Sequence, residues 1–121
     1  MMNNLNEEFV QGVYSAIVEG GVTFYSEIFR RPDGDNTIEY WRDARKLFRE
    51  FDEAQQNVFF SILKQVEIDT IANIFAVFDG IRGLDGSVEW LAKVYLNGID
   101  TNEDLSDDFL RYVEMIELGD S

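Results

Sequence analysis

The chain contains no cysteine and no histidine. Without cysteine it has no disulfide framework, no thiolate nucleophile, and no ordinary zinc-finger or iron–sulfur site. Without histidine it lacks the side chain that most often transfers protons near neutral pH and most often binds metals. Catalytic triads and ordinary haem sites are excluded, and we predict a protein that is not an enzyme and holds no cofactor.

Positive charge is scarce, with 10 Lys and Arg against 24 Asp and Glu, for a net charge of −14. That balance disfavours nucleic acid and anionic membranes as partners, because phosphates bind cationic surfaces. The longest unbroken apolar run, residues 74–78, is far shorter than the roughly 20 residues that cross a bilayer. The first 29 residues carry no Lys or Arg, which argues against a secretory signal. We expect a soluble cytoplasmic protein.

What the chain does contain suits one folded domain over residues 1–121. Apolar residues make up 45% of the sequence and include ten Phe, enough to build a core in a chain of this size. Apolar positions recur mostly at steps of three and four, which is the period of amphipathic helices. The sequence therefore predicts a mainly α fold, a single bundle of five to six helices.

In the first half, three helices are expected. The first has an apolar stripe of Leu5, Phe9, Val13 and Ile17, flanked by Val10, Tyr14 and Val18. We predict that Gly20 and Gly21 end it, since paired glycines readily close a helix. Residues 22–31 favour a short helix over a strand, and residues 32–35 form a turn.

From residue 36 or 37 a third helix should run to about residue 51, with Ile38, Trp41, Leu47, Phe48 and Phe51 on its apolar face and Arg42, Arg45, Lys46 and Arg49 on the other. Asp52 and Gln55 then form a capping pair that opens a further helix. Its inward positions are predicted to be Val58, Phe59, Ile62, Leu63 and Val66. Residues 68–78 are apolar nearly all round and belong in the middle of the domain, until Asp79 and Gly80 stop the helix.

Residues 87–98 allow two interpretations. Ser87 as a cap and Gly98 as a terminator favour a short helix slightly. Asn97 and Gly98 are instead a strong signal for a two-residue β-hairpin turn. Ser106 or Asp104 is expected to cap the last helix, which has Phe109, Leu110, Val113 and Ile116 on its apolar side.

Acidic residues concentrate in the C-terminal half. Residues 1–64 hold seven basic and eleven acidic side chains, a balance of −4, whereas residues 65–121 hold three and thirteen, a balance of −10. Five carboxylates fall within nine positions, namely Asp100, Glu103, Asp104, Asp107 and Asp108. One interpretation is that they interact with the positive end of the last helix or are simply solvated. The other is that they form a surface for a basic partner.

Two sharper hypotheses for acidic residues fit less well. An EF-hand beginning at Asp100 would need Gly and Glu where Leu105 and Arg111 stand, so we predict no metal site. Asp69 and Asn73 share a face of the central helix, but catalysis there would require a desolvated carboxylate in a cleft. A hydrogen-bonded structural role is the commoner outcome for such a residue.

A protein that acts by contact remains. A strongly acidic surface steers basic partners and raises their association rate. Exposed aromatic side chains often anchor such complexes, and we select Tyr40 and Trp90 beside the five carboxylates as partner-binding residues. Trp41 has the spacing of a core residue, and Tyr40 points roughly 100° away from it.

In its general character, and in the stretch from Asp69 through Asp79 and Gly80 to Leu105 and Phe109, the chain resembles small acidic bacterial proteins of the immunity type. Such proteins neutralise a toxin made by the same cell. The resemblance implies a cytoplasmic, non-enzymatic inhibitor, and it assigns no individual site residue. We therefore expect an acidic inhibitor of a basic toxin or nuclease. The alternative is a structural or regulatory helical domain that self-associates, for example as a homodimer.

Overall fold

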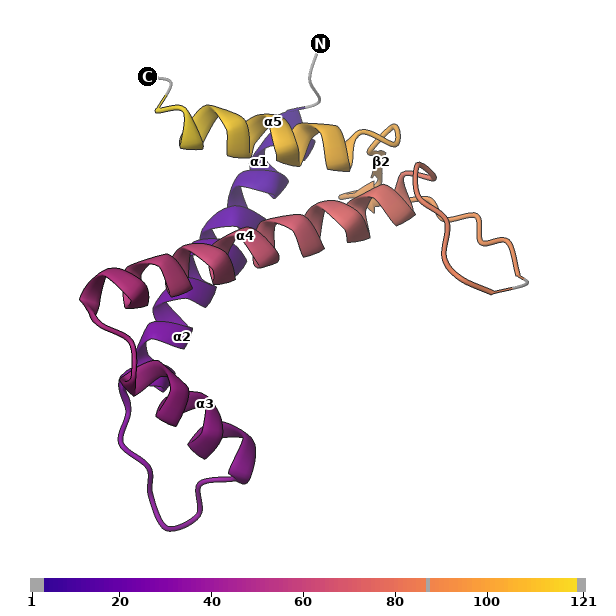
Figure 1. The fold of residues 1–121 in the computed structure, drawn as a ribbon. Helices are drawn as coiled ribbons and strands as arrows, with labels where there is room; N and C mark the ends of the chain where they lie inside the picture. Colours follow the sequence, from indigo (N-terminus) through magenta and orange to yellow (C-terminus); the bar gives the residue numbers. More distant parts are fainter. Residues whose placement is uncertain (1–3, 87, 120–121) are drawn as a thin grey trace.

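The computed structural model describes residues 4–86 and 88–119 (Figure 1). They form a mainly helical fold with one short antiparallel hairpin, as predicted. In chain order the elements are α1 (Asn4–Val13), the π-helical turn η1 (Tyr14–Glu19), α2 (Gly20–Arg30), α3 (Glu39–Arg49), α4 (Glu53–Phe78), β1 (Tyr95–Leu96), β2 (Ile99–Asp100) and α5 (Leu105–Glu117). Since α1, η1 and α2 run on without a break, the described residues contain four continuous helical segments, slightly fewer than expected.

The first helix does not end at its two glycines, so that prediction is wrong. Gly20 keeps helical angles, with φ −62° and ψ −37°, and its N–H donates to the carbonyls of Ser15 and Ile17. Gly21 instead allows a close approach of α4. A Cβ atom at this position would lie 2.5 Å from a carboxylate oxygen of Glu67. Neither glycine therefore ends the helix, and Gly21 instead makes room for the Glu67 side chain of α4.

The buried face of this long helix is rotated by one residue from the predicted stripe. Val10, Tyr14 and Val18 are buried, whereas Ile17 is exposed. Asn6 continues the buried row at the same four-residue step and is itself fully buried. Positions 6, 10, 14 and 18 repeat every four residues, as do the predicted positions 5, 9, 13 and 17. Periodicity alone therefore could not show which of the two rows is buried.

Helix α4 is the longest helix and contacts η1, α2 and α5. The capping box predicted at its start is confirmed. Asp52 accepts a hydrogen bond from the Gln55 N–H at 2.8 Å, and the Gln55 side chain accepts one from the Asp52 N–H at 2.9 Å. The helix ends at Asp79 and Gly80, where Gly80 has φ +77°. With 26 residues it is about 39 Å long. It crosses the first helical segment, and α5 packs across its C-terminal half (Figure 1).

Two apolar clusters hold the helices together along α4. One cluster joins α1, η1, the C-terminal half of α4 and α5, and it consists of Val10, Tyr14, Val18, Ile68, Phe75, Leu105 and Phe109. The other joins α2, α3 and the N-terminal half of α4 around the ring of Phe29. That ring lies within 6.4 Å, centroid to centroid, of Tyr25, Trp41, Phe48, Phe59 and Phe60.

Helix α3 differs from expectation on both of its faces. Ile38 and Leu47, predicted to face inward, are exposed, although Phe48 is buried. Arg45, predicted on the polar face, is buried. Its Nε donates to the Ile28 carbonyl at 2.8 Å, and its Nη1 lies 3.0 Å from a carboxylate oxygen of Asp33. Arg45 thus ties α3 to the end of α2 and to the following loop.

The ambiguous segment before α5 forms a hairpin, so the favoured helix is wrong and the alternative is confirmed. Tyr95 pairs with Asp100 and Leu96 with Ile99. Asn97 and Gly98 both have positive φ, 52° and 79°, as a two-residue type I′ turn requires. The predicted cap at Ser87 lies outside the described residues.

The N-terminal half of α4 exposes residues that were predicted to face the core. Val58, Ile62 and Val66 retain 59%, 56% and 55% of their accessible surface. Phe59 and Leu63, from the same prediction, are half-buried. The prediction is wrong for the first three because α2 and α3 cover only one side of this part of the helix.

Glu67 is a polar side chain of α4 whose burial opposes folding at neutral pH. Both of its carboxylate oxygens are buried against α2 near Gly21, and neither accepts a hydrogen bond from the described residues. Burial raises the pKa of the Glu67 carboxyl above its ordinary value of 4.5. The folded protein therefore binds this proton more tightly than the unfolded chain, and the stability associated with Glu67 falls as pH rises from about 4.5 through the raised pKa.

We expect Glu67→Gln to raise the free energy of unfolding at pH 7 by about 1 kcal/mol, because it removes a buried, unpaired charge. The difference from the parent chain should shrink toward zero near pH 4, where Glu67 itself is neutral. Urea unfolding of both proteins across this pH range measures it. A constant difference at every pH would contradict the assignment.

Candidate functional site

The carboxylates singled out in the sequence gather at one end of the molecule, where the hairpin leads into α5 (Figure 1). Asn102 and Glu103 adopt left-handed backbone angles, with φ 58° and 60°. The Asp100 side chain accepts the Asn102 N–H at 2.8 Å, and the Thr101 N–H donates to the Val94 carbonyl at 3.1 Å. This tight turn brings Asp100 and Glu103 close to the first turn of α5.

The start of α5 is capped by Asp79, the residue that directly follows α4. The Ser106 N–H donates to the Asp79 carboxylate at 2.7 Å, and the Ser106 hydroxyl donates to the Ala72 carbonyl at 3.3 Å. Asp104 occupies the position before the helix but makes no side-chain cap hydrogen bond. The cap therefore comes from Asp79 and not from Asp104 or Ser106 as predicted, and it joins the end of α4 to the start of α5.

Asp108 does not belong to the surface on which we placed it. It is buried, it accepts a hydrogen bond from Asn6 Nδ2 at 3.1 Å, and it lies 3.6 Å from Arg111 Nη1. Asn6 Nδ2 also donates to the Thr101 carbonyl at 3.0 Å. Asp108 thus links α5 to α1 and to the turn after the hairpin, and a partner could not reach it.

The remaining four carboxylates form what we call the acidic end, namely Asp100, Glu103, Asp104 and Asp107. The last three are exposed, whereas Asp100 is half-buried. Two of them, Asp104 and Asp107, lie close enough to the buried Asp79 to change its pKa. Burial raises the pKa of its carboxyl above 3.8, the backbone N–H groups of α5 oppose this, and the negative charges of Asp104 and Asp107 raise it further.

Little positive charge offsets the acidic end. Lys93 Nζ lies 3.7 Å from an Asp100 oxygen. Within residues 4–86 and 88–119, no Lys or Arg nitrogen lies within 4.0 Å of the carboxylates of Glu103, Asp104 or Asp107. The cations of α3 are at the other end of the molecule, where Arg45 and Arg49 bind Asp33 (Figure 1). The negative potential is therefore local and largely uncompensated.

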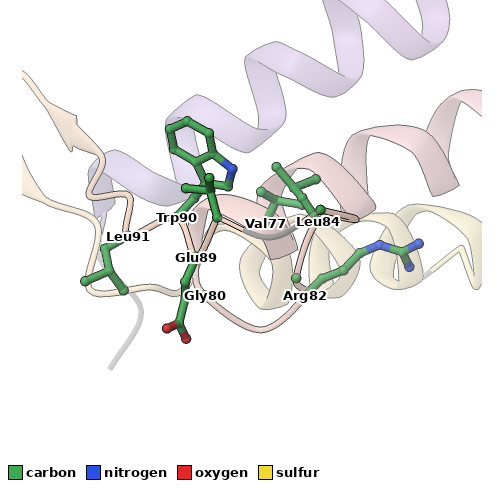
Figure 2. Close-up of a pocket in the computed structure, with 10 residues that line it drawn as sticks. Val77, Gly80, Arg82, Leu84, Glu89, Trp90 and Leu91 are labelled. Atoms are coloured by element: carbon green, nitrogen blue, oxygen red, sulfur yellow. The ribbon is translucent and has the colours of Figure 1, made fainter.

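Of the two aromatic candidates, only Trp90 is close in the chain to the acidic end. It is 68% exposed and lies in the loop after α4, four residues before Val94, whose carbonyl binds the turn. Trp90 borders a hollow of about 350 Å³ whose apolar lining includes Val77 and Leu84 (Figure 2). Tyr40 is also exposed, at 66%, but it lies in the first turn of α3, far from the other candidates (Figure 1).

The pair considered for catalysis does not form a buried acid. Asp69 is exposed and accepts a hydrogen bond from Gln65 at 2.9 Å, and Asn73 accepts one from Arg82 at 3.2 Å. Neither lies in a desolvated cleft, so the chemistry that required one has no support here. Among the described residues no three acidic side chains are placed to share a metal ion.

Comparisons of this chain with known protein families, with curated proteins and with solved structures find no match. The described helices include none with the length and apolar character needed to cross a membrane. The site must therefore be interpreted from its own geometry.

Sequence reasoning missed the two buried polar residues that position the acidic end. Asp79 was interpreted only as a helix stop, although a carboxylate directly after an apolar helix is well placed to accept hydrogen bonds from the start of another helix. Asn6 lies four residues before Val10, in register with the row that is buried. A polar residue in register with an apolar stripe is the signal that could have identified it.

We expect Asp79→Ala to lower the free energy of unfolding by about 2 kcal/mol, because it leaves the Ser106 N–H buried without its acceptor. The matched control is Asp104→Ala, which removes a carboxylate from the same helix start but no cap hydrogen bond, and which should cost no more than about 0.5 kcal/mol. Urea unfolding at pH 7 measures both. An equal cost for the two substitutions would show that the capping role is misassigned.

Proposed function

We propose that this protein is an acidic binding module that inhibits a basic protein, such as a toxin or nuclease, by covering its cationic surface. The observation that carries the proposal is the acidic end, where three exposed carboxylates, Glu103, Asp104 and Asp107, gather. No Lys or Arg nitrogen of the described residues lies within 4.0 Å of them. The module acts by contact and needs no chemistry of its own. Its target carries a site that normally binds phosphate or another anion.

The acidic end is poorly explained as a helix cap. Asp79 supplies the cap hydrogen bond of α5, and Asp104 supplies none. The charges of Asp104 and Asp107 even work against Asp79, since they raise the pKa of its carboxyl. Like charges held together at a surface lower stability unless a cation balances them. A basic partner would provide that balance, and this supports a binding role for these residues.

Buried hydrogen bonds support the acidic end from below. Asn6 binds both the Thr101 carbonyl and Asp108, and Ser106 binds both Asp79 and Ala72. These buried hydrogen bonds hold the turn and α5 on α1 and α4. A surface that is ordered before binding loses less entropy when its partner docks. The exposed indole of Trp90 supplies an apolar anchor on the neighbouring loop.

The first partner to test is a basic protein encoded next to this gene in the source genome. We expect fast association that slows at least tenfold when salt rises from about 50 mM to about 500 mM, because electrostatic steering is screened. The variant Glu103→Gln/Asp104→Asn/Asp107→Asn should lower the association rate constant at low salt by roughly tenfold, with a smaller effect on dissociation. Stopped-flow fluorescence of Trp90 and Trp41 follows both rates.

The matched control removes three exposed carboxylates elsewhere, as Glu19→Gln/Glu27→Gln/Glu39→Gln. It changes the net charge of −14 by the same amount as the test variant. If both triple variants slow association equally, total charge rather than the acidic end does the steering. If the neighbouring gene product is basic and does not bind, the proposed inhibition is wrong.

A further inference from the structure

A second surface, unrelated to the acidic end, lies on the N-terminal half of α4. We call Val58, Ile62 and Val66 the α4 stripe. They are spaced four residues apart on one helix face, and each is more than half exposed. An apolar hollow of about 390 Å³ adjoins the stripe, lined in part by Phe51 and Phe59. Contiguous exposed apolar surface of this kind marks an interaction site in a folded protein.

The stripe is also free of charge, in a chain where 28% of residues are charged. Lys64 is the only charged residue in the sequence from 54 to 66. It is directed away from the stripe, because its Nζ lies 3.6 Å from a Glu117 oxygen and 5.9 Å from the centroid of the Tyr14 ring. Depletion of charge at an exposed apolar centre is the compositional mark of an interface core.

The accessible surface of the isolated chain is too large for a compact monomer. It measures 8661 Å², about 2,000 Å² more than is usual for a monomeric protein of 14.0 kDa. Obligate homodimers bury roughly 1,000 to 2,500 Å² on each subunit. The excess surface therefore matches in size what one subunit of a stable dimer covers.

We propose that the occupant of the α4 stripe is a second copy of this chain, packed antiparallel across a two-fold axis near Ile62. Ridges of four-residue spacing interdigitate with identical ridges at a crossing angle of about −50°, so the stripe is complementary to itself. In this register Val58 of one copy meets Val66 of the other, and the two Asp69 carboxylates lie on opposite sides of the crossing point.

The charge distribution selects the antiparallel arrangement. The acidic end follows α4, and the C-terminal half of the chain carries a balance of −10. Asp79 lies about 26 Å from Ile62 along the axis of α4. In an antiparallel pair the two acidic ends would therefore lie on the order of 50 Å apart. That is several times the screening length of about 8 Å at physiological salt. A parallel pair would instead place both acidic ends, and both Asp69 carboxylates, side by side.

Sedimentation equilibrium of the full chain tests the proposal. We expect a particle of twice the 14.0 kDa chain mass, with a dissociation constant at or below the micromolar range. The dimer should persist at about 500 mM salt, because screening weakens the repulsion between its copies. A monomer at about 100 μM would overturn the proposal without touching the acidic end, which is tested by salt-sensitive binding of a cationic protein.

Ile62→Glu should raise the dissociation constant by roughly a hundredfold or more, since two buried isoleucines are lost in each dimer. The control is Ile74→Glu, the same substitution at an equally exposed site on α4, about 120° around the helix from Ile62. It should leave the dimer intact. Circular dichroism and urea unfolding verify that both variants fold. Equal dissociation constants for the two variants would remove the stripe from the interface.

Cysteine substitution tests the orientation, and the absence of native cysteine makes the result easy to interpret. Under mild oxidation, Ile62→Cys should cross-link to itself. A mixture of Val58→Cys and Val66→Cys should cross-link between the two variants, whereas each alone should not. Cross-linking of Val58→Cys or Val66→Cys with itself would indicate a parallel pair and contradict the proposed geometry.

Discussion

The structure depends on one long helix, α4, whose apolar surface is larger than the area that the other helices cover. Helix α4 spans about 39 Å and has apolar side chains on every side, with no marked polar face. Its C-terminal half packs against η1, α1 and α5, which bury Ile68 and Phe75 but leave Ile74 half exposed. Its N-terminal half packs on one side against α2 and α3, and Lys64 also contacts Glu117 and the Tyr14 ring. The α4 stripe is left in solvent. The open shape in Figure 1 and the large accessible surface both follow from this shortage of partners.

Polar anchors determine where the acidic end lies. Hydrophobic packing holds α5 against α4 but does not fix its orientation. Asp79 accepts a hydrogen bond from the first turn of α5. Asn6 donates to Asp108 of α5 and to the turn before it. Such buried contacts cost stability if they are broken, so they select one placement among several of similar apolar area. The exposed carboxylates are thus held in place by buried polar residues that themselves never reach the surface.

Sequence periodicity and caps predicted the class of the fold well. The Asp52 and Gln55 capping box and the stop at Gly80 are local features, determined by neighbouring residues. The turn predicted at residues 32–35 lies slightly later, where the Thr37 N–H donates to the Gly34 carbonyl. The failures are tertiary. Gly21 accommodates Glu67 from another helix, and Arg45 and Asp108 are buried because distant groups bind them. The exposed α4 stripe could not be foreseen either, since an apolar helix face has the same sequence pattern whether its cover is present or not.

Charge and apolar surface are separated along the molecule, and this separation lets one chain support two kinds of contact. Residues 1–64 have a balance of −4 and hold Val58 and Ile62 of the α4 stripe. Residues 65–121 begin beside Val66, the last residue of the stripe, have a balance of −10 and carry the acidic end. An apolar contact needs nearby charge to be low, because a buried unpaired carboxylate opposes association. A steering surface needs the opposite, a local excess of one sign. Had the same carboxylates been spread evenly, they would have weakened both surfaces at once. Placing them at the far end of α4 preserves both, and it gives the two contacts opposite responses to salt.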